Sequence, residues 1–226
     1  MELRLKIEMN ENLFLRNPEE TDLGRKIIQN GIKLIHQIGF ESFTFKKLAK
    51  LIGTTEAGIY RYFENKQLLL IYIVDWYWSW QQFRITYYSN NCKTSREKLL
   101  KAIDILSEPV VDDVSTPYIN EYLLYEIVMS EGAKAYLTRN VIKYNEAKLF
   151  KPYKDLCLTI SNLITNCNSQ YQYPRSLATN IIEMSHSLNF YKKNLPNLTD
   201  TNLVKDTDFI TRFIEEMVFA TIKPEV

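Results

Sequence analysis

The sequence predicts an all-α fold, and three observations lead to this prediction. Glycine and proline are scarce, with 6 and 7 residues among 226, which favours long helices over turn-rich β structure. Apolar residues recur every three or four positions along most of the chain, which is the spacing of one helical face. With 46% hydrophobic and 24% charged residues, the composition is that of an ordinary globular protein with a large core.

The chain begins with an arm, residues 1–20, that precedes the first predicted helix. The arm carries three basic and five acidic side chains, so its charge argues against contact with nucleic acid. We expect it to be disordered or passively packed. The first helix is expected over residues 21–38, and Gly39 closes it. Its apolar stripe comprises Leu23, Ile27, Ile28, Gly31, Leu34, Ile35 and Ile38.

Residues 44–70 contain the most informative pattern of the chain. Thr44 is a suitable N-cap for a helix with one apolar face, and Gly53 follows the last apolar position, where a left-handed residue ends a helix cheaply. Thr55 can then cap a second helix over residues 56–63. Two short helices joined through a glycine turn indicate a helix-turn-helix, whose second helix enters the major groove of DNA.

The chain resembles the DNA-binding domain of TetR-family transcriptional regulators over about residues 21–70. The resemblance runs in register without gaps through Arg25, Ile27, Ile28, Leu34, Ile35, Ile38, Gly39, Phe40, Thr44, Leu48, Ala49, Ile52, Gly53, Ile59, Tyr60, Arg61, Tyr62, Phe63, Lys66 and Leu69. It implies an N-terminal three-helix DNA-binding domain at 21–66 and a helical regulatory and dimerisation domain at 67–226. The implied function is a homodimeric repressor that a small lipophilic or aromatic ligand releases from a pseudo-palindromic operator.

The resemblance also implies which residues touch double-stranded DNA. Phosphate contacts are expected from Thr44, Tyr60, Tyr62 and Lys66. Base contacts are expected from Thr55, Glu56 and Arg61, with Ala57 or Gly58 allowing close approach. Glu56 could instead serve only as a partner of the helix dipole. Residues 21–70 hold eight basic and four acidic side chains, so positive charge gathers where a phosphate-binding surface requires it, although a solvated helix surface could also carry it.

Further helices are predicted over residues 66–88, 95–106, 118–129, 131–150, 153–166, 174–193 and 202–222, with a loop at 109–117. The first of these is unusually aromatic, and one face carries Trp76, Trp80, Phe83 and Tyr87. Aromatic residues at this spacing suit either a core or a ligand pocket. The candidate pocket comprises Trp76, Trp80, Phe83, Tyr87, Tyr122, Tyr125 and His186.

The last two predicted helices carry wide apolar faces that need cover. By resemblance they form a four-helix dimer interface with a second copy of the chain. Alternatively, they close the core of the monomer. The candidate interface comprises Leu177, Ile181, Met184, Leu188, Phe209, Phe213 and Met217.

An enzyme is not expected, because the chain has only two histidines and lacks a catalytic or glycine-rich phosphate-binding pattern. The three cysteines form no CxxC pair, which indicates reduced thiols in the cytoplasm and no metal site; no cofactor is expected. No signal peptide is recognisable, and the longest apolar run, 68–74, is too short to span a membrane. The alternative function is a helical ligand-binding or adaptor protein that has lost DNA binding.

Overall fold

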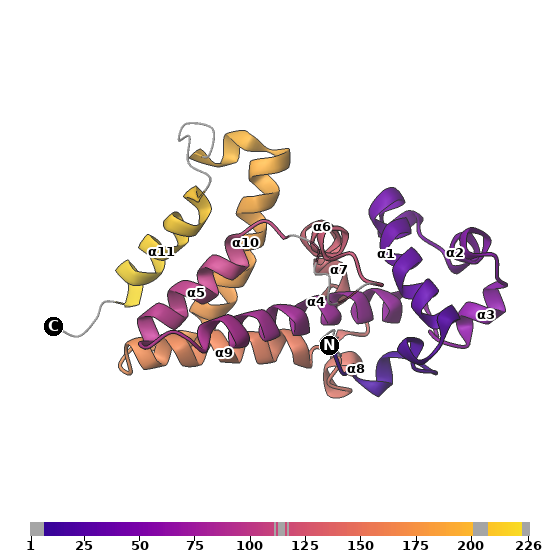
Figure 1. Cartoon of the computed structure of the whole chain (residues 1–226), viewed down its shortest axis with the longest axis horizontal. Coiled ribbons are helices and arrows are strands. Elements are labelled where there is room, and N and C mark those ends of the chain that lie inside the picture. The colour runs from indigo at the N-terminus through magenta and orange to yellow at the C-terminus, as the bar shows by residue number, and fades with distance from the viewer. Residues whose placement is uncertain (1–6, 111, 113–115, 117, 201–207, 223–226) are drawn as a thin grey trace. The chain divides into compact units, whose positions relative to one another are not determined.

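The computed structural model describes residues 7–110, 112, 116, 118–200 and 208–222, and it confirms the all-α fold (Figure 1). The contacts divide the chain into two compact units. Unit 1 contains residues 1–78 and 110–152, and unit 2 contains residues 79–109 and 153–226. Helix α4 (Lys66–Ser89) therefore contributes to both units. The predicted domain boundary after residue 66 falls inside unit 1.

Unit 1 is organised around α1 (Asp22–Ser42), which packs against α2 (Phe45–Ile52), α6 (Glu121–Glu131) and the 3-10 turn η2 (Pro18–Glu20). Thr21 caps the start of α1, because its Oγ1 accepts a hydrogen bond from the Gly24 backbone N–H at 3.0 Å. Near its end, Gly39 has φ 73° and ψ 156°. Helical geometry is thus interrupted at the glycine that the sequence predicted to close this helix.

The prediction of one helix in unit 1 is wrong. Residues 131–150 were expected to form a single helix, but they contain two short ones, α7 (Ala133–Tyr136) and α8 (Val141–Glu146). The amphipathic pattern is broken here, since Leu137 and Ile142 are 83% and 72% exposed. Lys148 adds a second interruption, because its φ of 58° lies in the left-handed region.

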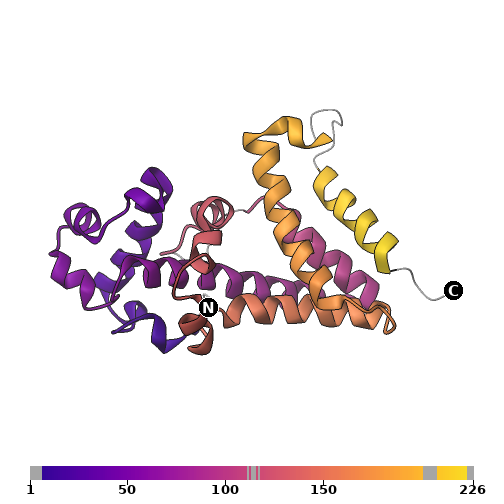
Figure 2. The same ribbon diagram turned by 180° about the vertical axis from the view of Figure 1, so that it is seen from behind.

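Unit 2 contains α5 (Ser95–Ser107), most of α9 (Lys151–Cys167), α10 (Pro174–Asn194), the 3-10 turn η3 (Pro196–Leu198) and α11 (Phe209–Ile222) (Figure 2). Helix α10 packs against both α5 and α11. Helix α9 was predicted to begin at residue 153 but begins at Lys151, because Pro152 lies in its first turn, where a proline removes no intrahelical hydrogen bond. Residues 202–207 of the last predicted helix lie outside the described residues.

Helix α4 is buried on every side over its first half. All residues from Leu68 to Trp78 are buried, so this stretch belongs to a core rather than to an amphipathic surface. The start of the helix matches the prediction, since Asn65 Oδ1 accepts a hydrogen bond from the Leu68 N–H at 3.0 Å. No helix among the described residues is long and apolar enough to cross a membrane.

Candidate DNA-binding surface and effector region

Helices α2 and α3 (Glu56–Tyr60) form the predicted helix-turn-helix. Each begins with a threonine cap: Thr44 Oγ1 accepts from the Lys47 N–H at 3.2 Å, and Thr55 Oγ1 accepts from the Gly58 N–H at 3.1 Å. Gly53 ends α2 with φ 70° and ψ 36°, as the sequence predicted. The three local signals therefore set the geometry of the motif.

The exposed side of this motif carries most of the predicted DNA contacts. Thr44, Thr55, Ala57 and Arg61 are exposed, and Tyr60 is 45% exposed. Glu56 and Gly58 are half-buried. On the inner side, Ile59 and Phe63 are fully buried, which fixes the orientation of α3 on the domain. Helix α3 ends three residues earlier than predicted, because the chain turns after Tyr60 to bury Tyr62 and Phe63.

Tyr62 does not fit its predicted role as a phosphate contact. It is 3% exposed, and its hydroxyl lies 2.7 Å from Thr21 Oγ1, the cap of α1. A buried tyrosine whose hydroxyl is already hydrogen-bonded inside the domain is poorly placed to contact a DNA phosphate. Its position indicates a structural link between the end of the recognition helix and the start of α1.

Lys66 also differs from expectation. Its Nζ donates to the carbonyl oxygens of Phe40, Glu41 and Phe43 at 2.9, 3.2 and 3.2 Å, and it lies 4.6 Å from the centre of the Phe40 ring. All three protons of the ammonium group are thereby used at the C-terminal end of α1, where carbonyls lack helical partners and attract a cation. The geometry supports a helix cap rather than the expected phosphate contact.

Residues 7–20 of the N-terminal arm are packed within unit 1, so of the two expectations, disorder and passive packing, the second fits the described part of the arm. Beside the turn η1 (Glu11–Leu13), Asn10 Nδ2 donates to the Ala147 carbonyl at 3.1 Å. Leu15 N–H donates to the Tyr62 carbonyl at 2.8 Å, and the Arg16 guanidinium lies 5.6 Å from the Tyr62 ring centre. Sequence reasoning missed these contacts because their partners are distant along the chain.

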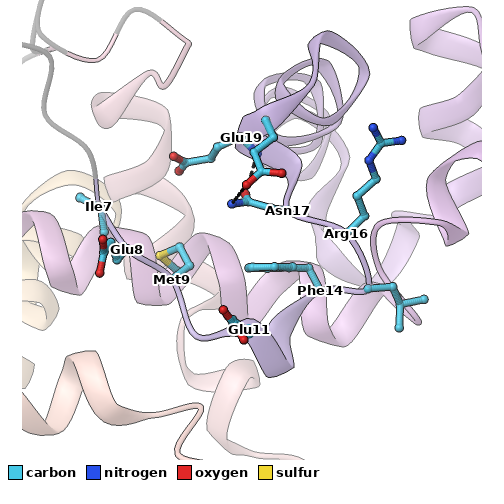
Figure 3. A pocket seen from close by; sticks show the side chains of 10 residues that line it. Ile7, Glu8, Met9, Glu11, Phe14, Arg16, Asn17 and Glu19 are labelled. Carbon is cyan, nitrogen blue, oxygen red and sulfur yellow. Dashed lines mark hydrogen bonds between the residues drawn. The ribbon is translucent and has the colours of Figure 1, made fainter.

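A cavity of about 550 Å³ lies along the arm, and its lining is acidic (Figure 3). The guanidinium of Arg16 borders the cavity together with four carboxylates, which belong to Glu8, Glu11, Glu19 and Glu20. This charge balance is unfavourable for phosphate binding. The cavity gives no support to a DNA contact from the arm.

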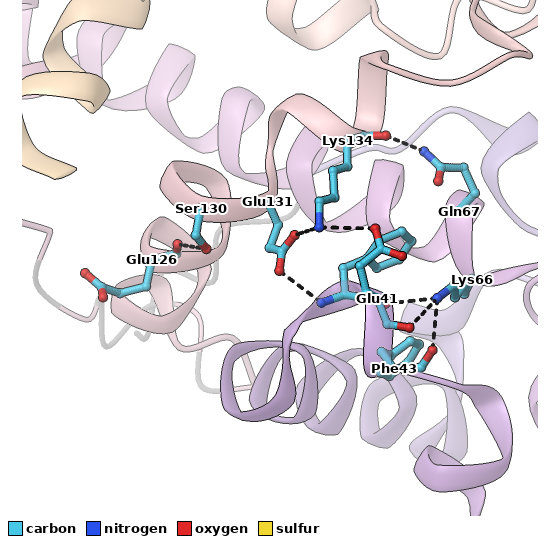
Figure 4. A network of polar contacts seen from close by, with 9 residues as sticks. Glu41, Phe43, Lys66, Gln67, Glu126, Ser130, Glu131 and Lys134 are labelled. Carbon is cyan, nitrogen blue, oxygen red and sulfur yellow. Dashed lines mark hydrogen bonds and ion pairs between the residues drawn. The ribbon is translucent and has the colours of Figure 1, made fainter. Parts of the chain in front are cut away.

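A polar network joins α6 and α7 to the ends of α1 and α4 (Figure 4). Glu131 Oε1 accepts from the Phe40 N–H at 3.0 Å, and its Oε2 lies 2.7 Å from Lys134 Nζ. Lys134 Nζ also lies 3.2 Å from a carboxylate oxygen of Glu41, and the Lys134 carbonyl accepts from Gln67 Nε2 at 2.8 Å. The network thus connects helices of the predicted regulatory region to the frame that holds α2 and α3.

The predicted pocket residues divide into buried and exposed groups. In unit 1, Trp76 and Tyr125 are buried, whereas Tyr122 is 44% exposed. In unit 2, Trp80 and His186 are buried, whereas Phe83 and Tyr87 are 42% and 60% exposed and stack with ring centres 5.8 Å apart. The expected continuous aromatic face on α4 is therefore interrupted, because its last two members lie at the surface.

Two buried titratable groups stand out in these regions. His186 Nδ1 donates to the Ile182 carbonyl at 2.7 Å, and burial lowers the pKa of the imidazole from its ordinary value. Asp75 on α4 is 0% exposed, and burial raises the pKa of its carboxyl well above its ordinary value. Sequence reasoning overlooked Asp75, although an acid within the apolar run 68–80 was the available signal.

The predicted dimer residues also divide. Leu177 and Ile181 are 6% and 0% exposed inside unit 2, which argues against their contacting a second chain. Phe213 is 43% exposed and stacks on Phe209 with ring centres 6.3 Å apart. The remaining members, Met184, Leu188 and Met217, are half-buried. The outward part of the predicted interface is therefore confined to these last residues and the Phe209–Phe213 pair.

The described residues bring together no group of three or more His, Cys, Asp or Glu that could hold a metal ion. Cys92, Cys157 and Cys167 are free thiols. Burial raises the pKa of the Cys157 and Cys167 thiols, which makes them poor nucleophiles at neutral pH.

Residues 27–73 match the family model described as bacterial regulatory proteins, tetR family. No curated protein is significantly similar to the chain in sequence. Solved structures show the same fold at low sequence identity. A tetR-family regulatory protein from Rhodococcus RHA1 has a TM-score of 0.63 and 11% identity, with 89% of this chain and 97% of that chain covered.

Two further solved structures have names that state a function. The fatty acid degradation regulator FadR from Bacillus halodurans has a TM-score of 0.61 and 17% identity, covering 88% of this chain and 96% of that one. AibR in complex with isovaleryl coenzyme A and operator DNA has a TM-score of 0.57 and 18% identity, covering 89% and 100%. Residues 27–73 therefore carry a domain that matches the tetR family of bacterial regulatory proteins, and the chain as a whole shares its helical fold with these solved structures.

Proposed function

We propose that the protein is a cytoplasmic, non-enzymatic repressor that binds a pseudo-palindromic operator as a homodimer and is released by a small-molecule effector. The observation that carries the proposal is the exposed face of the capped α2–turn–α3 motif. Its inner residues are buried, while the side chains suited to DNA project from its outer face.

The DNA contacts are assigned by position and chemistry. At the start of α2, the Thr44 hydroxyl, free backbone N–H groups and the exposed Lys46 suit a phosphate. At the end of α3, Arg61 can donate two hydrogen bonds to guanine O6 and N7, and at the start of α3, Glu56 can accept from cytosine N4. Tyr62 and Lys66 are removed from the proposed contact set because their polar groups hold the domain together.

The proposed dimerisation is supported by the half-buried apolar residues of α10 and α11. Two copies of one recognition helix related by a two-fold axis read two inverted half-sites, which is why the operator is expected to be pseudo-palindromic. The outward residues Met184, Phe213 and Met217 supply the proposed contact. Leu177 and Ile181 are assigned to the core of unit 2 instead of the dimer contact.

Release by an effector requires that the ligand binds one conformation more tightly than another. The network of Glu131, Lys134 and Gln67 offers a physical route within unit 1, because it joins α6 and α7 to α1 and α4. A displacement of α6 therefore bears directly on the helix that supports the recognition motif. The AibR complex, which contains operator DNA and a small molecule, supports a regulator of this type.

Fluorescence anisotropy with DNA from the region upstream of the protein's own gene tests the proposal. We expect saturable binding that weakens as salt rises and that exceeds binding to shuffled DNA of equal length. Arg61→Ala should reduce this preference, whereas Lys143→Ala, which removes an exposed lysine of α8, should leave it unchanged. Binding to neither DNA would favour the alternative, a helical adaptor that has lost DNA binding.

A further inference from the structure

The core of unit 1 contains a carboxylate for which the described part of the chain provides no partner. Asp75 lies on α4 within the fully buried stretch 68–78 and is itself 0% exposed. Neither Oδ1 nor Oδ2 has a hydrogen-bond partner among the described residues. Burial raises the pKa of this carboxyl well above its ordinary value, and no charged neighbour in the described part of the chain offsets that cost.

An unpaired acid at this position is costly for the fold. Removing an ionised carboxylate from water without a compensating charge or donor costs several kcal/mol, so the group stays neutral until a partner arrives. A leucine at the same place would bury apolar surface without this cost. The acid therefore calls for an explanation other than packing.

The surroundings of Asp75 on its own helix are aromatic. Tyr72 and Trp78 are three residues before and after it, so they lie on the same side of α4. The Tyr72 hydroxyl lies 3.1 Å from a Glu19 carboxylate oxygen, and Trp78 Nε1 donates to the Tyr136 hydroxyl at 2.7 Å. The polar tips of both flanking rings thus have other partners, while the rings themselves remain beside the acid.

Further buried aromatic rings lie on another side of this stretch of α4, because residues two apart on a helix do not face each other. Tyr77 is fully buried and meets Trp78 edge to face with ring centres 5.0 Å apart. Tyr125 from α6 is buried with its ring centre 6.3 Å from that of Tyr77. A buried carboxylate flanked on its side of α4 by the rings of Tyr72 and Trp78 offers negative charge beside electron-rich rings, which together are complementary to an organic cation.

We propose that Asp75 is the charge-recognition residue of the effector site and that the effector is a lipophilic organic cation of the ammonium class. This inference rests on the proposed function, and it narrows the lipophilic or aromatic ligand expected from the sequence to a cation. A metal ion is a poor alternative, because the described residues supply no cluster of further ligands around the acid. The positive charge of the ligand pairs with the Asp75 carboxylate, and its alkyl or aryl groups pack against the neighbouring rings.

Binding of a matched pair of probes tests the inference. Phenethyltrimethylammonium carries the cation, and (3,3-dimethylbutyl)benzene is its uncharged carbon isostere. Tryptophan fluorescence quenching measures both affinities in the full chain. We expect the cation to bind at least tenfold more tightly than the isostere. Asp75→Asn, which preserves shape and removes the charge, should weaken cation binding roughly 30-fold or more and leave the isostere unchanged.

The stability of the variant separates recognition from a structural role. Because Asp75 has no hydrogen bond to lose, Asp75→Asn and Asp75→Leu should unfold in urea at the same or a higher concentration than the unsubstituted protein. A destabilised Asp75→Leu variant, equal binding of the two probes, or unchanged cation affinity in Asp75→Asn would each overturn the inference. Failure of operator binding without any probe would instead count against the proposed function alone.

Discussion

Replacement of Lys66 by methionine should destabilise the protein without removing a phosphate contact. The ammonium group donates to three carbonyl oxygens at the end of α1 and lies over the Phe40 ring. Methionine keeps most of the side chain's apolar contact but leaves these carbonyls without a donor. Hydrogen bonds to a charged group contribute about 1.5–3 kcal/mol, and water can reach part of this site, so we expect a total loss of about 2–3 kcal/mol.

Urea unfolding followed by circular dichroism measures this loss. A decrease of that size corresponds to a midpoint shift of roughly 1 M, given a urea dependence of about 2–3 kcal/mol per M for a chain of this length. Lys46→Met is the matched control, because Lys46 is an exposed lysine near the start of α2. It should change the unfolding free energy by no more than about 0.5 kcal/mol.

The salt dependence of DNA binding completes the test. A phosphate contact contributes about 0.9 to the slope of log affinity against log salt. Lys46→Met should lower the slope by up to about that amount, whereas folded Lys66→Met should retain the slope of the unsubstituted protein. Lys66 is not a helix cap if Lys66→Met unfolds at the original urea concentration and its salt slope falls by nearly one.

Three further changes test other parts of the structure. Arg61→Ala should relax the preference at one base pair by about 1–3 kcal/mol, measured by anisotropy on operators substituted one position at a time. Gly24→Ala should lower the unfolding free energy by about 1–3 kcal/mol in urea, because an added Cβ would lie 2.2 Å from the Pro18 carbonyl oxygen. His186 has a lowered pKa in the folded state, so its contribution to stability is complete above its ordinary pKa of 6.5 and is lost as pH falls below it. His186→Phe should therefore flatten the fall in unfolding free energy as pH decreases below about 6.5, and an equally steep fall would exclude this histidine as a cause.

The helix-turn-helix could be predicted from sequence because its signals are local. Thr44, Gly53 and Thr55 each act on backbone groups within a few residues, so their roles follow from the order of residues along the chain. The predicted helix 131–150 failed for a related reason. Its apolar spacing suggested one face, but Leu137 and Ile142 point to solvent, and periodicity alone does not reveal which apolar residues find a core.

The roles of Tyr62 and Lys66 could not be predicted in this way. Tyr62 bonds to Thr21, 41 residues earlier, and Lys66 bonds to carbonyls more than twenty residues earlier. A sequence pattern shows that a side chain can donate a hydrogen bond, but only the tertiary fold shows which acceptor lies within reach. Asp75 is the opposite case. The sequence shows an acid directly after the apolar run 68–74, but only the structure shows that this acid is buried without a hydrogen-bond partner among the described residues.

The end of α1 is bonded to α6 and to α4. These contacts limit where the chain can be cut to isolate the helix-turn-helix. A fragment ending after Lys66 would keep the carbonyl cap but lose the Glu131 acceptor for the Phe40 N–H. It would also lose Tyr72, whose ring lies 5.5 Å from that of Phe63. The recognition motif is therefore not a transplantable module at residues 21–66, and a chimaeric regulator built from it would have to carry α6 and the first half of α4 as well.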